Sequence, residues 1–383
     1  MRKSESGFEK IENPPQRIVL KLGSAVLTRE GDDRLDENLL DDVAREVSRL
    51  FDEGREVIIV SSGAVAAGLG LLRPQKRDGS LPEKQALAAV GQSRLMHMYS
   101  AHFSRYRRSI AQILLTRDDM EDRRRYLNAS YTLERLLSLG VIPIINENDT
   151  TTVEELRFGD NDVLSAIVAA KMKADFLILL SDVDGLFDRD PRKNSGAELV
   201  TRVEKITPEI ESMAEKAPSR LGAGGMRSKI QAATRASYAG AHVCICNGKK
   251  RDVLRKLFSG VCPGTLFLPS GEKELTSRQR WIAIGKSGVN RWVIVDDGAR
   301  KALVEGKKSL LPVGIREVKG KFDRGEVVEI RDSEGNRLGK GLVNYDSQDI
   351  MKIQGARSHE IEKILGRKEY DEVIHRDNLI VFD

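Results

Sequence analysis

The sequence predicts an α/β fold on a mostly parallel sheet, followed by a smaller β-rich domain. Short apolar runs typical of buried strands alternate with segments of helical period up to about residue 268. From about Arg280 the chain changes to short strands and turns with little helix. A chain of 383 residues is long enough for two or three domains. We therefore expect an N-terminal extension over 1–16, an α/β domain over 17–270, a linker over 271–279 and a β-rich domain with the C-terminal segment over 280–383.

The first strand–helix–strand unit carries the clearest pattern. Residues 17–23, RIVLKLG, predict a strand, and residues 36–54 predict an amphipathic helix capped by Asp36, because apolar side chains recur every three or four positions. Residues 56–63, EVIIVSSG, predict the next strand. Strands of a mostly parallel sheet are covered by helices on both faces, which is a three-layer arrangement. The later strands that we expect cover residues 111–116, 141–146, 175–182, 241–246 and 264–269.

Composition excludes several classes of protein. The 63 basic and 58 acidic residues nearly cancel, so charge gives no reason to expect a general nucleic-acid binder. Cys244, Cys246 and Cys262 lack the CxxC spacing of a zinc site and are odd in number, so we expect buried thiols. The basic N-terminus has no apolar core behind it, and no apolar run approaches the ~20 residues that span a bilayer. We expect a cytoplasmic protein.

Small and charged residues follow the predicted strands. In parallel sheets ligands bind beyond the carboxyl ends of the strands, so these positions are where a site is expected. Taken singly, Asp160 or Asp162 could cap a helix, and Asp182 and Asp184 could shape a turn. Together with lysines and glycines they indicate a site for a magnesium-bound nucleotide. The residues concerned are Lys21, Gly23 and Ser24, then Ser61 to Gly63, then Asn146 to Thr150, and finally Ser181, Asp182 and Asp184.

A glycine-rich segment precedes one predicted helix. In residues 219–236, SRLGAGGMRSKIQAATRA, we expect Gly222, Gly224 and Gly225 to adopt positive φ where needed and to let backbone N–H groups close around an anion. Lys229 adds a charge in the first turn of the helix. Such a turn can also be a plain connection between two elements, so the loop indicates an anion site only in combination with the other motifs. No GxxxxGK[ST], HRD–DFG pair or GxGxxG after the first strand is present, which excludes the common nucleotide-binding motifs.

Six motifs, in this order, resemble the amino acid kinase family: VLKLGSAVL, VIIVSSGAVAAG, INENDT, GDNDVLSA, LLSDVDGLF and GAGGMRSKIQAA. Three further stretches, ALAAVGQSRL, LLTRDDMEDRRRYLNA and FGDNDVLSA, resemble the branch of that family that phosphorylates the side-chain carboxylate of L-glutamate at the start of proline biosynthesis. The resemblance begins near Ile18 and reaches the C-terminus. Residues 280–383 resemble a PUA domain, a small β-rich module.

The resemblance implies roles for individual residues. Lys21 and Lys229 would bind phosphate oxygens from opposite sides, and Asp162 would orient both lysines. Asp149 would bind the substrate ammonium, and Asn161 would complete the polar pocket. A substrate carboxylate would be bound by Ser62 with the backbone N–H groups of Gly63 and Ala64.

The nucleotide site follows from the same resemblance. Beside the two lysines it would comprise Ser181, Asp182, Ala223, Gly224, Gly225, Met226, Arg227 and Ser228. Two positions depart from the usual pattern, because Ala223 and Ser181 stand where threonine is common. A side-chain hydroxyl contact at position 223 is therefore lost.

The implied reaction needs ATP with Mg²⁺ and no general base, because a glutamate side chain is already ionised at pH 7. Magnesium would be held mainly by nucleotide oxygens and water, so no dedicated protein ligands are expected. The resemblance also implies proline as a feedback inhibitor acting through the loop around Asp149, and a homo-oligomer, either a dimer or a tetramer. Glutamate-5-semialdehyde dehydrogenase would be a partner, because the phosphorylated product is labile. We expect no membrane partner and no RNA, although Lys307, Lys308 and Arg316 could form a basic patch or a solvated face.

Two alternatives remain open at this point. Another small-molecule kinase of the same fold, such as an acetylglutamate kinase, would share most of these motifs. An RNA-binding protein with a degenerate kinase domain would keep the PUA-like segment, but both lysines and every acidic motif are present, which argues against it.

Overall fold

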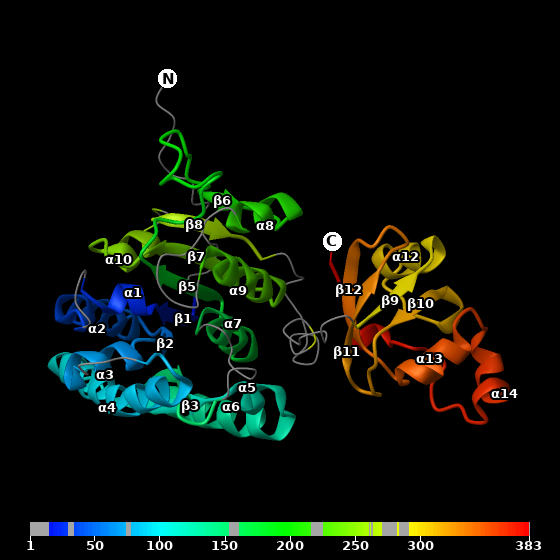
Figure 1. Ribbon diagram of the computed structural model, residues 1–383, viewed down its shortest axis with the longest axis horizontal. Coiled ribbons are helices and arrows are strands. Elements are labelled where there is room, and N and C mark those ends of the chain that lie inside the picture. Colours follow the sequence, from blue (N-terminus) through cyan, green and yellow to red (C-terminus); the bar gives the residue numbers. More distant parts are fainter. Residues whose placement is uncertain are drawn as a thin grey trace. The chain divides into compact units, whose positions relative to one another are not determined.

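The computed structural model of this chain describes residues 15–29, 34–73, 78–152, 161–215, 225–259, 261, 263–269, 282 and 291–382. The chain divides into two compact units, Met1–Pro269 and Ser270–Asp383 (Figure 1). Most of the expected extension and the whole expected linker, residues 1–16 and 271–279, lie outside the described residues. Those two boundaries stay predictions.

Within the described residues, the first unit contains an eight-stranded sheet in the order β3-β4-β2-β1-β5-β7-β8-β6. Neighbours from β3 to β7 pair in parallel, and only the β7–β8 pair is antiparallel. The prediction of a mostly parallel sheet is confirmed, whereas the two-residue strand β6 was not expected. The strands are β1 (Arg17–Leu22), β2 (Glu56–Ser61), β3 (Ile110–Leu115), β4 (Ile142–Glu147), β5 (Phe176–Ser181), β6 (Arg202–Val203), β7 (His242–Asn247) and β8 (Gly264–Phe267).

The helices of this unit begin and end where local sequence signals place them. Asp36 caps α2, since its carboxylate accepts from the backbone N–H groups of Asn38 and Leu39 at 3.1 and 3.4 Å. The described helices are α1 (Ser24–Leu27), α2 (Glu37–Asp52), α3 (Ala64–Leu72), α4 (Leu81–Arg105), α5 (Arg117–Glu121), α6 (Arg123–Ser138), α7 (Asn161–Lys171), α8 (Pro208–Glu215), α9 (Met226–Tyr238) and α10 (Val253–Phe258).

Helices cover both faces of the sheet. On one face, alternate strand residues such as Ile18, Leu20 and Ile178 share an apolar core with α2, α4 and α10. The opposite face contacts α7 and α9, and Figure 1 shows these two helix layers on either side of the strands. Apart from β3 and β6, the strands are buried on both faces, which explains why they read as continuous apolar runs. Cys244 and Cys246 lie in this interior as free thiols.

Two glycines bring α3 and α4 into backbone contact. A Cβ atom on Gly91 of α4 would lie 1.8 Å from the carbonyl oxygen of Ala64, the first residue of α3. A Cβ atom on Gly68 of α3 would lie 2.0 Å from the carbonyl oxygen of Leu87. Only glycine permits this approach.

The second unit has its own sheet and core. Its described strands form a five-stranded sheet in the order β10-β9-β11-β12-β13, antiparallel except between β9 and β11. A separate apolar cluster fills it. The elements are β9 (Trp292–Val295), α12 (Asp297–Val304), η2 (Pro312–Gly314), β10 (Ile315–Lys319), β11 (Val327–Arg331), β12 (Arg337–Leu342), α13 (Ser347–Ile353), η3 (Ser358–Glu360), α14 (Ile361–Leu365), η4 (Arg376–Asn378) and β13 (Leu379–Val381).

The exposure of three basic side chains in the second unit favours a solvated face over a basic binding patch. Lys307, Lys308 and Arg316 are all exposed, and Arg316 pairs with Asp296 at 3.4 Å. In neither unit does a described helix have the length and apolar character needed to cross a membrane.

Candidate active site

Three elements bring Lys21, Asp162 and Lys229 together at the carboxyl edge of the first sheet. Lys21 lies on β1, Asp162 in the first turn of α7 and Lys229 in the first turn of α9. One oxygen of Asp162 forms an ion pair with Lys21 Nζ, and the other lies 3.1 Å from Lys229 Nζ. All three side chains are buried, with Asp162 fully enclosed. The three residues that the resemblance implied as catalytic are therefore in contact.

Burial gives this cluster a chemical preference. Two ammonium groups share one carboxylate, so the three groups together carry one excess positive charge. A buried charge is costly unless it is paired. Among these three groups the balance therefore favours an incoming anion, as a phosphate would provide.

The start of α9 supports the same carboxylate. Ser228 Oγ lies within hydrogen-bonding distance of Asp162 Oδ2 (3.0 Å) and of the carbonyl oxygen of Gly225 (2.9 Å), which share its single proton. Gly225 caps α9 at φ −80° and ψ −175°, so it does not use the positive φ that glycine permits. Extended backbone at the cap position is the ordinary entry to a helix, and it needs no left-handed conformation.

Not all of the predicted nucleotide loop can be placed. Gly222, Ala223 and Gly224 lie outside the described residues. Met226 is buried, whereas the Arg227 side chain is exposed.

The loop after β5 contains the other predicted nucleotide residues. Ser181 is buried and its hydroxyl donates to Asp182 Oδ1 at 3.1 Å, and Asp182 itself is exposed. Asp184 lies two residues after Asp182. Lys250 lies 2.8 Å from the Asp184 carboxylate and lowers its pKa, and a hydrogen bond donated by Asn247 lowers that pKa further. Asp184 is thus a paired carboxylate, which fits a role in shaping the turn.

Neutral amides occupy the neighbouring part of the edge. Asn161 Nδ2 lies within hydrogen-bonding distance of the Ser61 carbonyl (3.0 Å), Ser62 Oγ (2.9 Å) and Asn146 Oδ1 (2.8 Å). Asn146 Nδ2 in turn donates to Gln92 Oε1 of α4 at 2.9 Å. The predicted substrate residues Ser62 and Asn161 are therefore in contact. Asp162, the next residue after Asn161, joins this network to the charged cluster.

The turn between β2 and α3 contains the residues that the resemblance implied for a substrate carboxylate. Gly63 caps α3 at φ 96°, a left-handed conformation in which glycine is favoured. The cap leaves the first N–H groups of α3, beginning at Ala64, directed out of the helix end. Ser62 is anchored through its own N–H, which donates to the Leu22 carbonyl at 3.0 Å.

Asp149 lies in the turn after β4 and is half-buried. The turn is tied internally, because the Thr152 hydroxyl donates to the Asn148 carbonyl at 2.8 Å. It is also tied externally, since Gln85 Nε2 of α4 donates to the Thr152 carbonyl at 3.2 Å. The fold holds the predicted ammonium ligand in a loop that is fixed at its end.

Sequence reasoning assigned no role to Gln92, and it placed Asn146 only within a polar cluster. The signal for Asn146 is a polar residue inside a fully buried strand, which requires a partner. Gln92 carries no such signal, because it is one polar position on a long helix.

The described residues contain no group of three or more His, Cys, Asp or Glu side chains arranged to hold a metal ion. Mg²⁺ bound through nucleotide phosphates takes one or two carboxylates at most. Asp182, exposed directly after β5, is a carboxylate of the required type.

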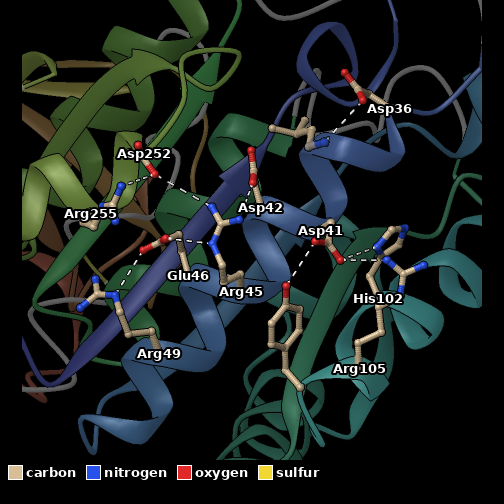
Figure 2. Close-up of polar contacts among 12 residues, drawn as sticks. Asp36, Asp41, Asp42, Arg45, Glu46, Arg49, His102, Arg105, Asp252 and Arg255 are labelled. Atoms are coloured by element: carbon tan, nitrogen blue, oxygen red, sulfur yellow. Dashed lines mark hydrogen bonds and ion pairs between the residues drawn. The ribbon is translucent and has the colours of Figure 1, made fainter.

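A cavity of about 220 Å³ lies beside α2 and is lined by none of the predicted site residues. Its lining includes Asp42, Arg45 and Glu46, which form ion pairs with one another (Figure 2). Both of these carboxylates thus already have an arginine as ion-pair partner. We place the site at the Lys21–Asp162–Lys229 cluster.

Comparison with known proteins identifies the families of both units. The profile of the Amino acid kinase family matches residues 16–247, and that of the PUA domain matches residues 291–365. A glutamate 5-kinase of Caldanaerobacter subterraneus subsp. tengcongensis is 47% identical over 367 residues, which cover 96% of this chain and 98% of that protein. A glutamate 5-kinase of Geobacter sulfurreducens is 50% identical over 368 residues, covering 96% and 97%.

Two solved structures resemble part of this chain at low identity. Carbamate kinase from Giardia lamblia bound to AMP-PNP has a TM-score of 0.49 and 15% identity, covering 66% of this chain and 98% of that one. UMP kinase from Bacillus anthracis has a TM-score of 0.45 and 18% identity, covering 68% and 98%.

Proposed function

This chain belongs to the amino acid kinase family, and we propose that it transfers the γ-phosphoryl group of ATP to the side-chain carboxylate of L-glutamate. The observation that carries the proposal is the buried contact of Lys21 and Lys229 with the two oxygens of one carboxylate, Asp162. The names of its relatives, glutamate 5-kinases along nearly the whole chain, supply the substrate. The product would be L-glutamate 5-phosphate, which opens proline biosynthesis.

The proposed mechanism is positioning and charge neutralisation. Phosphoryl transfer to a carboxylate brings two anions together, and the protein must offset their repulsion. Lys21 and Lys229 would contact oxygens of the moving phosphoryl group, and Asp162 would hold both ammonium groups in place. Mg²⁺, when bound with ATP, would supply further positive charge at the phosphates.

The nucleotide and the amino acid would bind on either side of this cluster. Ser181, Asp182 and the segment from Ala223 to Ser228 would hold ATP. The ammonium group would be bound by Asp149, and a carboxylate by Ser62 with the N–H groups of Gly63 and Ala64. Asn161, which contacts Ser62 and precedes Asp162, would join the two halves.

Regulation and partners form the finer part of the proposal. Proline carries a carboxylate and an ammonium group, so it would compete with glutamate at Asp149. On the family resemblance we also propose that the protein forms a homo-oligomer and that its compartment is the cytoplasm. Glutamate-5-semialdehyde dehydrogenase is proposed as a partner, because the phosphorylated product is labile. RNA is not proposed as a ligand.

The test is ADP release by the purified full-length protein with ATP, Mg²⁺ and one acceptor at a time. We expect turnover with L-glutamate and none with N-acetyl-L-glutamate, because acetylation removes the ammonium partner of Asp149. Proline should inhibit competitively with glutamate. Turnover with the N-acetyl compound alone would support the acetylglutamate-type alternative, and absence of any acceptor-dependent turnover would reject the kinase proposal.

A further inference from the structure

Helix α4 carries three polar side chains at seven-residue spacing, and each contacts a segment at the carboxyl edge of the sheet. Residues seven apart lie on nearly the same helix face, so the three form one stripe. The helix is otherwise held in the apolar core by side chains such as Leu95 and Phe103. The three contacts are Gln85 with the Thr152 carbonyl (3.2 Å), Gln92 with Asn146 (2.9 Å) and Tyr99 with Ser61 (2.8 Å).

The backbone fixes which way each amide of this network points. The N–H of Glu147 can only donate, and it lies 2.9 Å from Asn146 Oδ1. Asn146 Nδ2 must then face Gln92, which presents Oε1 to it. At the other end, the Ser61 carbonyl can only accept, so it faces Nδ2 of Asn161. Both anchors require the same orientations, which makes the assignment firm without reference to any ligand.

This polarity leaves an acceptor at the proposed substrate pocket. Asn161 Oδ1 is buried and has no hydrogen-bond partner among the described residues, and the same holds for Gln92 Nε2 at the other end of the network. A buried polar atom without a partner is unfavourable unless a ligand or water satisfies it. An oxygen held in this way suits an ammonium donor.

The same helix contacts the carboxylate side of the pocket. Gly91, adjacent to Gln92, packs against the backbone of Ala64, where a Cβ atom would meet the carbonyl oxygen at 1.8 Å. A shift of α4 would therefore move both the N-terminus of α3 and the segment around Asn146. One helix thus connects the two ends of the pocket.

We propose that Gln92 is a positioning residue for amino-acid recognition. The backbone anchors set the orientation of the Asn146 and Asn161 amides, and Gln92 Oε1, by accepting from Asn146, restricts their motion away from the orientation that an α-ammonium group requires. The proposal rests on the proposed function for the identity of the amino acid, L-glutamate. It adds a residue that does not itself contact the reacting groups.

The kinetic test compares Gln92→Met with wild type in the full-length protein. Methionine keeps the length of the side chain but cannot accept the hydrogen bond from Asn146. We expect the KM for L-glutamate to rise about tenfold, the effect of one hydrogen bond, while kcat and the KM for ATP change less than about twofold. Gln112→Met, at an exposed glutamine on β3, is the matched control and should change none of these. An unchanged glutamate KM in Gln92→Met overturns the proposal.

A double-mutant cycle asks whether Gln92 acts through Asn146. In an Asn146→Ala background, Gln92→Met should raise the glutamate KM by less than about twofold, because the contact it removes is already absent. Effects that multiply would show that Gln92 acts by another route, which also overturns the proposal.

Hydrogen exchange tests positioning without any substrate. The N–H of Glu147, which donates to Asn146, should exchange at least about fivefold faster in Gln92→Met than in wild type. Gln92→Glu keeps an acceptor oxygen for Asn146 and should exchange at the wild-type rate. Equal exchange in all three proteins overturns the proposal even if the enzyme is active, whereas a wild-type protein inactive on L-glutamate would reject the proposed function alone.

Discussion

The two halves of the candidate site are built from different interactions. On the phosphate side, full charges meet, with two lysines on one enclosed carboxylate, Asp162. On the amino-acid side, neutral amides of Gln92, Asn146 and Asn161 form a directed chain anchored to backbone groups. The difference matches two tasks. Charged groups can stabilise a phosphoryl group as it is transferred, whereas oriented hydrogen-bonding groups can distinguish one ligand from another.

The halves should also respond differently to substitution. Removing one group that stabilises charge developing in the transition state typically costs ~2.7–4 kcal/mol. Removing one neutral hydrogen bond typically costs ~0.5–1.5 kcal/mol. We expect defects in kcat from the charged half and defects in KM from the recognition half.

The largest effect is expected from Lys229→Ala. The lysine would contact charge that develops in the transition state, so kcat should fall about 10²- to 10³-fold with little change in the glutamate KM. Steady-state rates at saturating ATP measure this, and Lys256→Ala, at an exposed lysine on α10, is the control. A wild-type kcat in Lys229→Ala would remove the distinction between the two halves.

Asp149→Asn should have the next largest effect, and on KM. A charge-assisted hydrogen bond is worth ~1.5–3 kcal/mol, so the glutamate KM should rise about ten- to hundredfold, and proline inhibition should weaken by a similar factor. Glutamate titrations at several proline concentrations give both constants. If glutamate binding collapsed while proline inhibition persisted, the shared binding site would be wrong.

Ser228→Ala tests the support of the charged half. Its hydroxyl lies 3.0 Å from Asp162 Oδ2 and supports that carboxylate by one hydrogen bond, so kcat should fall by about tenfold or less. The fall should be smaller than that of Lys229→Ala measured in the same assay. A fall as large as the lysine variant's would mean that Ser228 itself contacts the phosphate.

The smallest effect on either half is expected from removing the second unit. Residues 1–270 hold every site residue named above, and compact units of this kind can fold alone, so activity should stay within about threefold of the full chain. The proline response is expected to shift, because a unit remote from the chemistry acts through a conformational equilibrium. Parallel assays of both proteins, with and without total RNA, decide this. This prediction would be contradicted if residues 1–270 folded but were inactive, or if RNA activated the full-length protein.

Local pattern was enough to predict most of the fold. Apolar runs fix the strands because both faces of a parallel sheet are buried, and Asp36 marks the start of α2 because capping is a local interaction. Local pattern failed where geometry depends on distant neighbours. The two-residue strand β6, for example, exists only through pairing with β8.

The sequence by itself determined the type of each site residue and the strand or helix that carries it, because charge, glycine content and periodicity are local properties. Only the tertiary structure decided that Lys21 and Lys229 share the two oxygens of Asp162, since these residues come from three separate elements. It also decided that Gln92 meets Asn146 across 54 positions of sequence. Contacts between distant positions depend on how helices pack on a sheet, and no local pattern encodes that packing.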